Sequence, residues 1–146
     1  AIRLVVRSQM KAADTLQLAQ RFRKEFQADT ATTWCPFDQL TSLGEFDLII
    51  NTTPVGMNPN EADTPLSAEL LATAPDHAGV YDLIYRPLET RLLREAQAQG
   101  LATKDGLDML ICQGVAAFEL WTETRVPERL IPRLREKLAA AMASPV

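Results

Sequence analysis

The sequence predicts an α/β protein with a largely parallel sheet, and three observations lead to this prediction. Short aliphatic runs of strand length alternate with longer segments whose apolar residues recur every three or four positions. Several of these runs are almost continuously apolar, which is typical of strands covered on both faces. The intervening segments are long enough for right-handed crossover connections. We therefore expect the order β-α-β-(α)-β-loop-α-β-α-β-α-α, with helices flanking the sheet.

Five runs have the length and composition of strands: residues 2–6, 30–34, 46–50, 79–85 and 101–104. The run IRLVV at 2–6 is apolar and rich in β-branched residues, and FDLII at 46–50 is mostly apolar. We expect both of these strands to be buried on both faces.

A first helix is predicted over residues 10–27, with Ser8 placed to cap its N-terminus. Its apolar side chains recur on one face: Leu16, Ala19, Phe22 and Phe26. A helical turn is expected between Pro36 and Gly44.

The later helices are expected at residues 65–71, 89–99 and 106–123, followed by a last helix that opens at Pro127. Gly100 ends the second of these as a C′ residue. The last helix has leucines at a spacing of four: Leu130, Leu134 and Leu138. Its charged stretch ERLIPRLREKL is interpreted as a solvated face without special function.

Composition excludes several classes of protein. The 146 residues contain 15 Lys and Arg against 19 Asp and Glu, a net charge of −4, and the length is that of one domain. No apolar run reaches the roughly 18 residues of a membrane span, and the acidic balance argues against nucleic acid. One histidine, His77, and two distant cysteines, Cys35 and Cys112, offer no metal site and no disulfide framework. We interpret the cysteines as buried apolar residues in a reducing, cytoplasmic compartment.

Ligands of parallel α/β sheets bind beyond the carboxyl ends of the strands. Four segments lie at the carboxyl ends of predicted strands and carry polar groups: VRSQMK at 6–11, NTTPVGM at 51–57, YDLIYRP at 81–87 and DGLDMLICQG at 105–114. The second of them begins a loop, residues 51–64, which is long for a compact domain and is therefore expected to be functional.

The first segment favours a phosphate. Arg7 offers a planar set of donors, and Ser8 and Lys11 can each add a contact. In a dinucleotide-binding fold, an acidic residue at the end of the second strand binds the ribose 2′-hydroxyl of NAD. A basic residue there instead suits the 2′-phosphate of NADP. The alternative is an exposed arginine beside a helix cap.

The second segment supplies donors beside a ligand from Asn51, two threonines and Gly56, while Pro54 restricts the shape of the loop. The alternative is a plain connection between a strand and a helix. In the third segment, Asp82 interrupts an apolar strand, where an unpaired charge is costly, so we expect a hydrogen-bonded partner. Tyr85 ends that strand, where its phenol can bind a polyol.

The fourth segment places Gly106, Met109 or Leu110, and Gln113 on one helix face. Gly106 allows a flat ligand to approach the backbone closely. Gln113 needs a partner, either a core group or a ligand. Core packing is the alternative for Met109 and Leu110.

Taken in this order, the four segments resemble the C-terminal nucleotide-binding half of the shikimate/quinate dehydrogenase family. Its Asn-x-Thr-Pro-x-Gly-Met loop matches NTTPVGM, and its Tyr-Asp-x-x-Tyr-x-Pro-x-x-Thr segment matches YDLIYRPLET. Its Asp-Gly-x-x-Met-Leu-x-x-Gln helix with a following Ala-Phe-x-Leu-Trp matches DGLDMLICQG and AAFELW. Its Asn-Arg-Thr/Ser motif resembles residues 6–8, with Val6 where the family usually has Asn. The resemblance covers residues 2–142.

The resemblance implies roles for individual residues. The adenosine 2′-phosphate end of NADP would be held by Val6, Arg7, Ser8, Gln9, Met10 and Lys11. The cofactor backbone would be flanked by Thr52, Thr53, Pro54 and Val55. Leu83 and Gly106 would contact the nicotinamide region, with Met109 as a further cofactor contact. Tyr85 and Gln113 would hydrogen-bond the ring hydroxyls or the carboxylate of shikimate.

The resemblance also implies parts that this chain does not contain. The fold would be a Rossmann-like parallel sheet with flanking helices that lacks its first strand and its Gly-rich loop, since no GxGxxG-like run occurs. The missing strand would lie between the strands at 2–6 and 46–50. The catalytic Lys/Asp pair would belong to an N-terminal substrate domain, supplied in cis or as a second chain, so no catalytic residue is assigned here. Residues 1–146 would be a partial NADP-binding domain, and helices 106–142 would pack toward the substrate domain.

The function so implied is the NADP-dependent, reversible reduction of 3-dehydroshikimate to shikimate in chorismate and aromatic amino-acid biosynthesis. We expect no metal, no nucleic-acid or membrane partner and a possible homo-oligomer. The alternatives are a non-catalytic nucleotide-binding or regulatory module of the same fold, a quinate dehydrogenase relative, and a dehydratase–dehydrogenase fusion.

Overall fold

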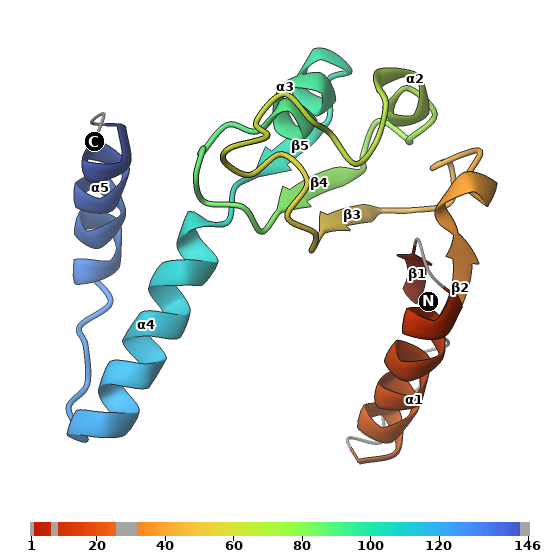
Figure 1. Ribbon diagram of the computed structural model, residues 1–146. Coiled ribbons are helices and arrows are strands. Elements are labelled where there is room, and N and C mark those ends of the chain that lie inside the picture. The colour runs from red at the N-terminus through yellow and green to blue at the C-terminus, as the bar shows by residue number, and fades with distance from the viewer. Residues whose placement is uncertain (1, 7–8, 26–31, 144–146) are drawn as a thin grey trace. The chain divides into compact units, whose positions relative to one another are not determined.

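The computed structural model describes residues 2–6, 9–25 and 32–143 (Figure 1). The chain forms two compact units, Ala1–Ser42 and Leu43–Val146, which we describe separately. Within the described residues, every helix is too short or too polar to cross a lipid bilayer.

The first unit is a β-α-β arrangement followed by one turn of 3-10 helix. Its elements are β1 (Ile2–Val6), α1 (Gln9–Glu25), β2 (Thr32–Pro36) and η1 (Phe37–Gln39). The two strands are parallel, with Ile2 opposite Thr32, and α1 packs against both of them. Leu16 and Ala19 are half-buried, as the predicted apolar face requires. Ser8 and Phe26 lie outside the described residues, as does the side chain of Phe22.

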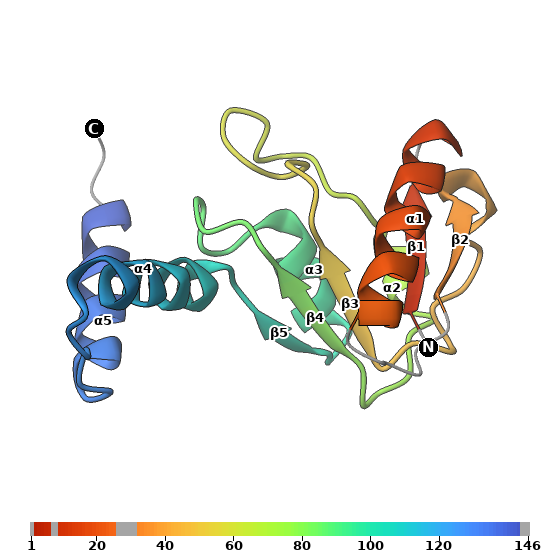
Figure 2. The ribbon, with the colours of Figure 1, turned by 90° about the horizontal axis from the view of Figure 1, so that it is seen from below.

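The second unit contains a three-stranded parallel sheet in the order β3-β4-β5 (Figure 2). Its elements are β3 (Leu48–Asn51), α2 (Ala68–Leu71), β4 (Gly79–Asp82), α3 (Arg91–Ala98), β5 (Ala102–Lys104), α4 (Leu107–Thr122) and α5 (Leu130–Ala143). Because every strand pair is parallel and helices alternate with strands, the predicted fold class and element order are confirmed.

The core of this unit lies where α3 packs on β4 and β5 and where α2 packs on α3. Its most deeply buried apolar residues include Leu71, Ala78, Val80, Leu92, Ala96 and Leu107. Helix α3 begins at the N-cap Thr90, whose side chain accepts a hydrogen bond from the backbone N–H of Leu93. It ends before Gly100, which has a φ of +80°, as the sequence predicts.

Several observed strands differ in their bounds from those predicted: β2 extends to Pro36, beyond the predicted end at Trp34, and β5 begins at Ala102. The strand predicted at 79–85 ends at Asp82, because the Asp82 carboxylate accepts a hydrogen bond from the backbone N–H of Ile84 and turns the chain out of the sheet. The strand predicted at 46–50 begins later, at Leu48.

The expectation that β1 and β3 are buried on both faces is wrong for this chain. Ile2 is 51% exposed, Leu48 56% and Ile50 49%. Among the described residues, β3 pairs only with β4 and β1 only with β2, so each has an unpaired edge. The apolar pattern of these strands therefore exceeds what the chain itself covers.

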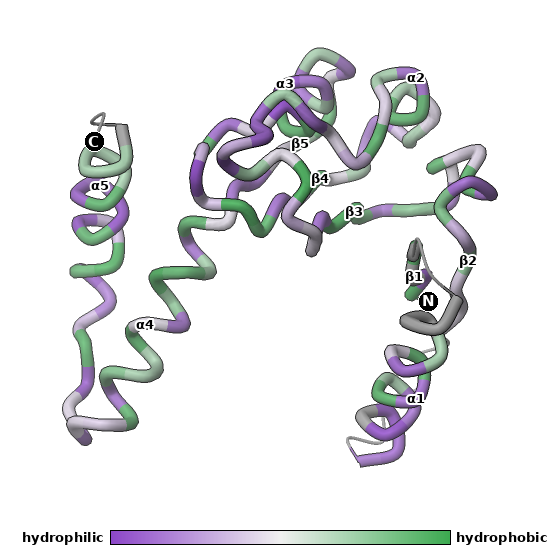
Figure 3. The backbone as a smooth tube through the Cα atoms, in the orientation of Figure 1, coloured by the Kyte–Doolittle hydropathy of each residue, from purple (hydrophilic) through white to green (hydrophobic). Residues whose placement is uncertain are grey.

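Helix α4 is hydrophobic along most of its length (Figure 3). Only Leu107 and Ile111, near its start, are buried, whereas Leu120 is 78% exposed and Trp121 82%. Helix α5 packs against α4, and its Leu134 is exposed.

Candidate functional site

A buried polar network joins the carboxyl ends of β3 and β4. Asp82, which has no exposed surface, accepts hydrogen bonds from Nδ2 of Asn51 at 3.0 Å, from the backbone N–H of Ile84 at 3.1 Å and from Oγ1 of Thr90 at 2.7 Å. Three donors satisfy a carboxylate that would otherwise be costly to bury. The prediction that Asp82 has a hydrogen-bonded partner is thus confirmed, and these hydrogen bonds give Asp82 a structural role.

The loop after β3 is folded around Asn51. The Oδ1 atom of this residue accepts hydrogen bonds from the backbone N–H of Thr53 at 3.0 Å and from its hydroxyl at 2.8 Å. Its Nδ2 atom also donates to the carbonyl of Val55 at 3.3 Å. Since the same amide binds Asp82, the shape of this loop is coupled to the end of β4.

The outer side of this loop is accessible to a ligand. Thr52, Thr53 and Pro54 are exposed, and Val55 is half-buried. Gly56 is buried with a φ of +97°, and a Cβ there would lie 3.2 Å from the carbonyl oxygen of Asp63. A glycine is therefore required to fold the loop back on itself.

Gly106 meets the chain segment that leaves β4. Its N–H donates to the carbonyl of Ile84 at 3.0 Å, and a Cβ on Gly106 would overlap the carbonyl oxygen of Leu83. The sequence attributes this glycine to the approach of a flat ligand. In the structure, the close approach is to the backbone of Leu83, because the start of α4 packs directly on that segment.

The other predicted residues of this region lie on the accessible surface. Tyr85 is 43% exposed and Met109 40%, and Gln113 is also exposed. Leu83 is half-buried beside Gly106. The structure thus brings Leu83 and Gly106 together, and α4 carries Met109 and Gln113 onward from them.

The first candidate segment lies partly outside the described residues. Arg7 and Ser8 lie outside the described residues, as do the side chains of Val6, Gln9, Met10 and Lys11. The backbone puts Val6 at the carboxyl end of β1 and Gln9 at the start of α1, which is the connection where the sequence expects a phosphate.

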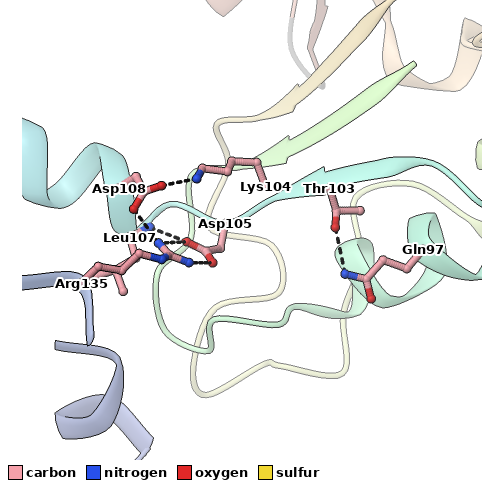
Figure 4. A network of polar contacts seen from close by, with 7 residues as sticks. All are labelled: Gln97, Thr103, Lys104, Asp105, Leu107, Asp108 and Arg135. Carbon is pink, nitrogen blue, oxygen red and sulfur yellow. Dashed lines mark hydrogen bonds and ion pairs between the residues drawn. The ribbon is translucent and has the colours of Figure 1, made fainter. Parts of the chain in front are cut away.

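An ion-pair cluster that the sequence did not predict lies at the start of α4 (Figure 4). Arg135 of α5 bonds both carboxylate oxygens of Asp105, at 3.0 and 2.6 Å, and one oxygen of Asp108 at 2.7 Å. Lys104 pairs with the other oxygen of Asp108. The interpretation of the last helix as carrying only a solvated charged face is therefore wrong. The residues involved are up to 30 positions apart, so no local pattern could reveal the contact.

The ion pairs change the pKa values of Asp105, Asp108 and Arg135. Partial burial opposes ionisation of Asp105, but the hydrogen bonds from Arg135 and from the N–H of Leu107, with the charge of Arg135, lower its pKa below the ordinary value. The hydrogen bond from Lys104, with one from Arg135 and the charges of both cations, lowers the pKa of Asp108 despite desolvation. The hydrogen bonds that Arg135 donates to both carboxylates raise the pKa of its guanidinium, although desolvation opposes this shift.

An open pocket of about 360 Å³ lies beside this cluster, and its wall includes Glu89, Lys104, Asp105 and Arg135. Both cations in that wall already bind carboxylates, so we assign the pocket no ligand.

Both cysteines are free thiols, but their predicted burial is wrong for Cys112, which is exposed, and Cys35 is half-buried. Cys112 follows the buried Ile111 by one position, and one residue turns a helix by more than a quarter of a turn.

Parallel strands, helical crossovers and polar loops at the carboxyl edge of the sheet define a Rossmann-type α/β protein. Comparison with known proteins shows which Rossmann-type proteins this chain resembles. A family model described as the shikimate 5′-dehydrogenase C-terminal domain matches residues 106–131. A curated shikimate dehydrogenase (NADP(+)) of Thermosynechococcus vestitus is 49% identical over 94 residues, which are 64% of this chain and 33% of the relative.

Solved structures agree with these matches. A shikimate dehydrogenase in complex with NADP+ has a TM-score of 0.79 and 34% identity, over 98% of this chain and 47% of that one. A quinate dehydrogenase of Corynebacterium glutamicum in complex with NAD has a TM-score of 0.76 and 27% identity, over 94% of this chain and 45% of that one. The chain belongs to the shikimate dehydrogenase family and corresponds to its C-terminal part. It spans about a third of the length of the curated relatives it matches.

Proposed function

We propose that this chain is the cofactor-binding part of an NADP-dependent shikimate dehydrogenase, which reversibly reduces 3-dehydroshikimate to shikimate. One observation carries the proposal. The segments NTTPVGM, YDLIYRPLET and DGLDMLICQG begin at the carboxyl ends of β3, β4 and β5, three parallel neighbours, and so start at one edge of one sheet. That edge is where α/β sheets bind their ligands.

The cofactor proposal rests on the chemistry of the donors. The cationic Arg7 and Lys11, with the hydroxyl of Ser8, suit the 2′-phosphate of NADP, and residues 6–8 include no acidic side chain. We assign Val6, Gln9 and Met10 to the same end of the cofactor.

The remaining cofactor contacts would come from the two loops of the second unit. The exposed groups of residues 52–55 would flank the cofactor backbone, and Leu83, Gly106 and Met109 would position the nicotinamide. NADPH, when bound, supplies the hydride.

The substrate contacts would come from Tyr85 and Gln113. Both side chains are exposed and follow the strands of the same sheet, and a phenol and an amide can bind and orient the hydroxyls of a polyol. We propose that the proton-transfer pair, Lys and Asp, belongs to an N-terminal part supplied in cis or as a second chain. The exposed apolar residues of α4, with Trp121 the most exposed, support packing of helices 106–142 on that part. Free thiols fit a cytoplasmic location.

The test uses what we call the completed enzyme: residues 1–146 preceded by the N-terminal part of a shikimate dehydrogenase, taken from its own coding sequence or from the T. vestitus relative. We expect oxidation of NADPH with 3-dehydroshikimate and reduction of NADP with shikimate. A preference for quinate, which the C. glutamicum neighbour makes the second candidate, would show as a higher kcat/KM for quinate than for shikimate. Cofactor binding without turnover would instead identify a non-catalytic module.

A further inference from the structure

Arg135 of α5 binds two carboxylates at the start of α4. Arg135 places its guanidinium against Asp105 in a two-point contact, with N···O distances of 3.0 and 2.6 Å, and it also reaches Asp108 at 2.7 Å (Figure 4). Two-point contacts of this kind fix orientation as well as distance. Arg135 therefore restricts where the first turn of α4 can lie.

Asp105 transmits this restriction to the backbone. Its Oδ1 atom accepts a hydrogen bond of 2.9 Å from the N–H of Leu107, the first residue of α4. Between them, Gly106 is in contact with the segment after β4, where it donates to the carbonyl of Ile84 and leaves no room for a Cβ beside Leu83. The start of α4 is thus held by the β4 segment and by Arg135.

The charges explain why this position depends on the arginine. Asp105 and Asp108 are like charges three residues apart, and the side chain of Asp105 is only 16% exposed. Lys104 pairs with Asp108 and not with Asp105. Without Arg135, the less exposed carboxylate would lose its cationic partner and would face a second negative charge on the next turn of the chain.

We propose that Arg135 is a positioning residue. Through Asp105 and Asp108 it fixes the first turn of α4, and with it the placement of Gly106, Met109 and Gln113 against Leu83 and Tyr85. This inference rests on the proposed function, which assigns those residues to the nicotinamide and the substrate. Arg135 itself touches neither ligand in this proposal.

The experiment compares Arg135→Gln, Arg135→Lys and a control, Arg133→Gln, in the completed enzyme. Arg133 is an exposed arginine on the same helix, so its loss matches the change in charge. We expect Arg135→Gln to lower kcat by about 10- to 100-fold, because misplacement of contacts around the reacting groups costs factors of this size. The KM for NADP should change by less than about twofold, since the adenosine end of the cofactor binds elsewhere. Arg135→Lys should recover part of the loss, and Arg133→Gln should behave as the wild type.

A further variant, Asp105→Asn, keeps the acceptor for Leu107 and weakens only the ion pair, so it should lower kcat in the same way. The thermal midpoint of each variant is measured alongside. A wild-type kcat in Arg135→Gln, or a loss of stability with kcat unchanged, would overturn the proposal. If Arg135→Gln does not fold, wild-type kcat in both Arg135→Lys and Asp105→Asn would overturn it. If the wild-type completed enzyme itself does not turn over 3-dehydroshikimate or quinate, the proposed function fails and this inference fails with it.

Discussion

The hydroxyl of Thr90 donates a hydrogen bond of 2.7 Å to the buried carboxylate of Asp82 and accepts one from the backbone N–H of Leu93. One oxygen atom therefore links the end of β4 to the first turn of α3. Asp82 in turn accepts from Asn51, which folds the loop after β3. The two loops that we assign to the cofactor and substrate thus share a single buried network, and damage to one part of it should reach the other.

Thr90→Ala should destabilise the protein by about 1–3 kcal/mol, because it removes a donor from a buried carboxylate and also removes the cap of α3. Chemical denaturation of the completed enzyme measures this loss. Thr90→Ser keeps the hydroxyl and is the control. Equal midpoints for the two variants would show that the hydrogen bond to Asp82 contributes little.

Arg7→Ala should weaken the preference for NADP. A charge-assisted contact to a phosphate contributes about 1.5–3 kcal/mol, which corresponds to roughly 10- to 150-fold in affinity. We expect the wild-type completed enzyme to favour NADP over NAD, and the variant to lose most of that ratio in kcat/KM. Lys24→Ala, an exposed cation near the end of α1, is the control. An unchanged ratio in Arg7→Ala would show that Arg7 does not bind the 2′-phosphate.

Tyr85→Phe and Gln113→Ala should affect the substrate more than the cofactor. Both side chains are exposed, Tyr85 beyond the carboxyl end of β4 and Gln113 on α4, and each variant removes a polar group that can bind a ring hydroxyl. We expect a higher KM for shikimate or a lower kcat, with the affinity for NADP nearly unchanged. Gln99→Ala, an exposed glutamine at the end of α3, should have no effect. Equal losses of NADP binding in both site variants would place these residues at the cofactor instead.

The lowered pKa values of Asp105 and Asp108 predict how stability depends on acidity. A carboxyl whose pKa is lower in the folded state stabilises the fold at pH values above its unfolded pKa, about 3.9, and this stabilisation is lost as the pH falls through the folded pKa. Arg135→Gln removes a main cause of the shift. Its acid unfolding, followed by circular dichroism, should therefore begin at a higher pH than that of the wild type or of Arg133→Gln. Coincident acid transitions would contradict the assigned role of the ion pairs.

Local patterns in the sequence predict most of this fold. Apolar runs and helical spacing give the order of the elements, and Gly100 marks the end of α3 because only a residue tolerant of positive φ suits that position. The polar segments after the strands identify the edge where the candidate site lies, because parallel strands bring their carboxyl ends together.

Contacts between distant residues could not be predicted in this way. The pairing of Arg135 with Asp105 depends on how α5 packs, and the sequence around Arg135 looks like any charged helix face. The close approach of Gly106 to Leu83 likewise depends on the position of α4. The exposure of Leu48 and Ile50 reverses an expectation that was based on composition alone, since an apolar strand is buried only if other elements cover it.

The final prediction concerns residues 1–146 expressed alone. Strand β3 has Leu48 and Ile50 exposed and, among the described residues, a hydrogen-bonding edge that no strand occupies, and β1 has an open edge as well. Unpaired edges with apolar side chains promote association between chains. The exposed Leu120 and Trp121 of α4 add a second apolar surface. We expect this chain alone to be oligomeric, aggregated or molten, and to bind no measurable NADP.

Adding the N-terminal part, in cis or as a second chain, should restore a cooperative unfolding transition and activity, because it would supply the strand that pairs with β3 and the surface that covers α4. Light scattering, near-UV circular dichroism and titration with NADP test this on the chain alone and on the completed enzyme.

Double substitution of Leu48 and Ile50 by Lys serves as a comparison. Charged side chains on an open edge suppress edge-to-edge pairing, so this variant should aggregate less than the wild-type chain when alone. It should also recover less activity on completion, since its charges would then be buried. A monomeric wild-type chain that unfolds sharply and binds NADP with micromolar affinity would refute the prediction and would favour a self-sufficient nucleotide-binding module.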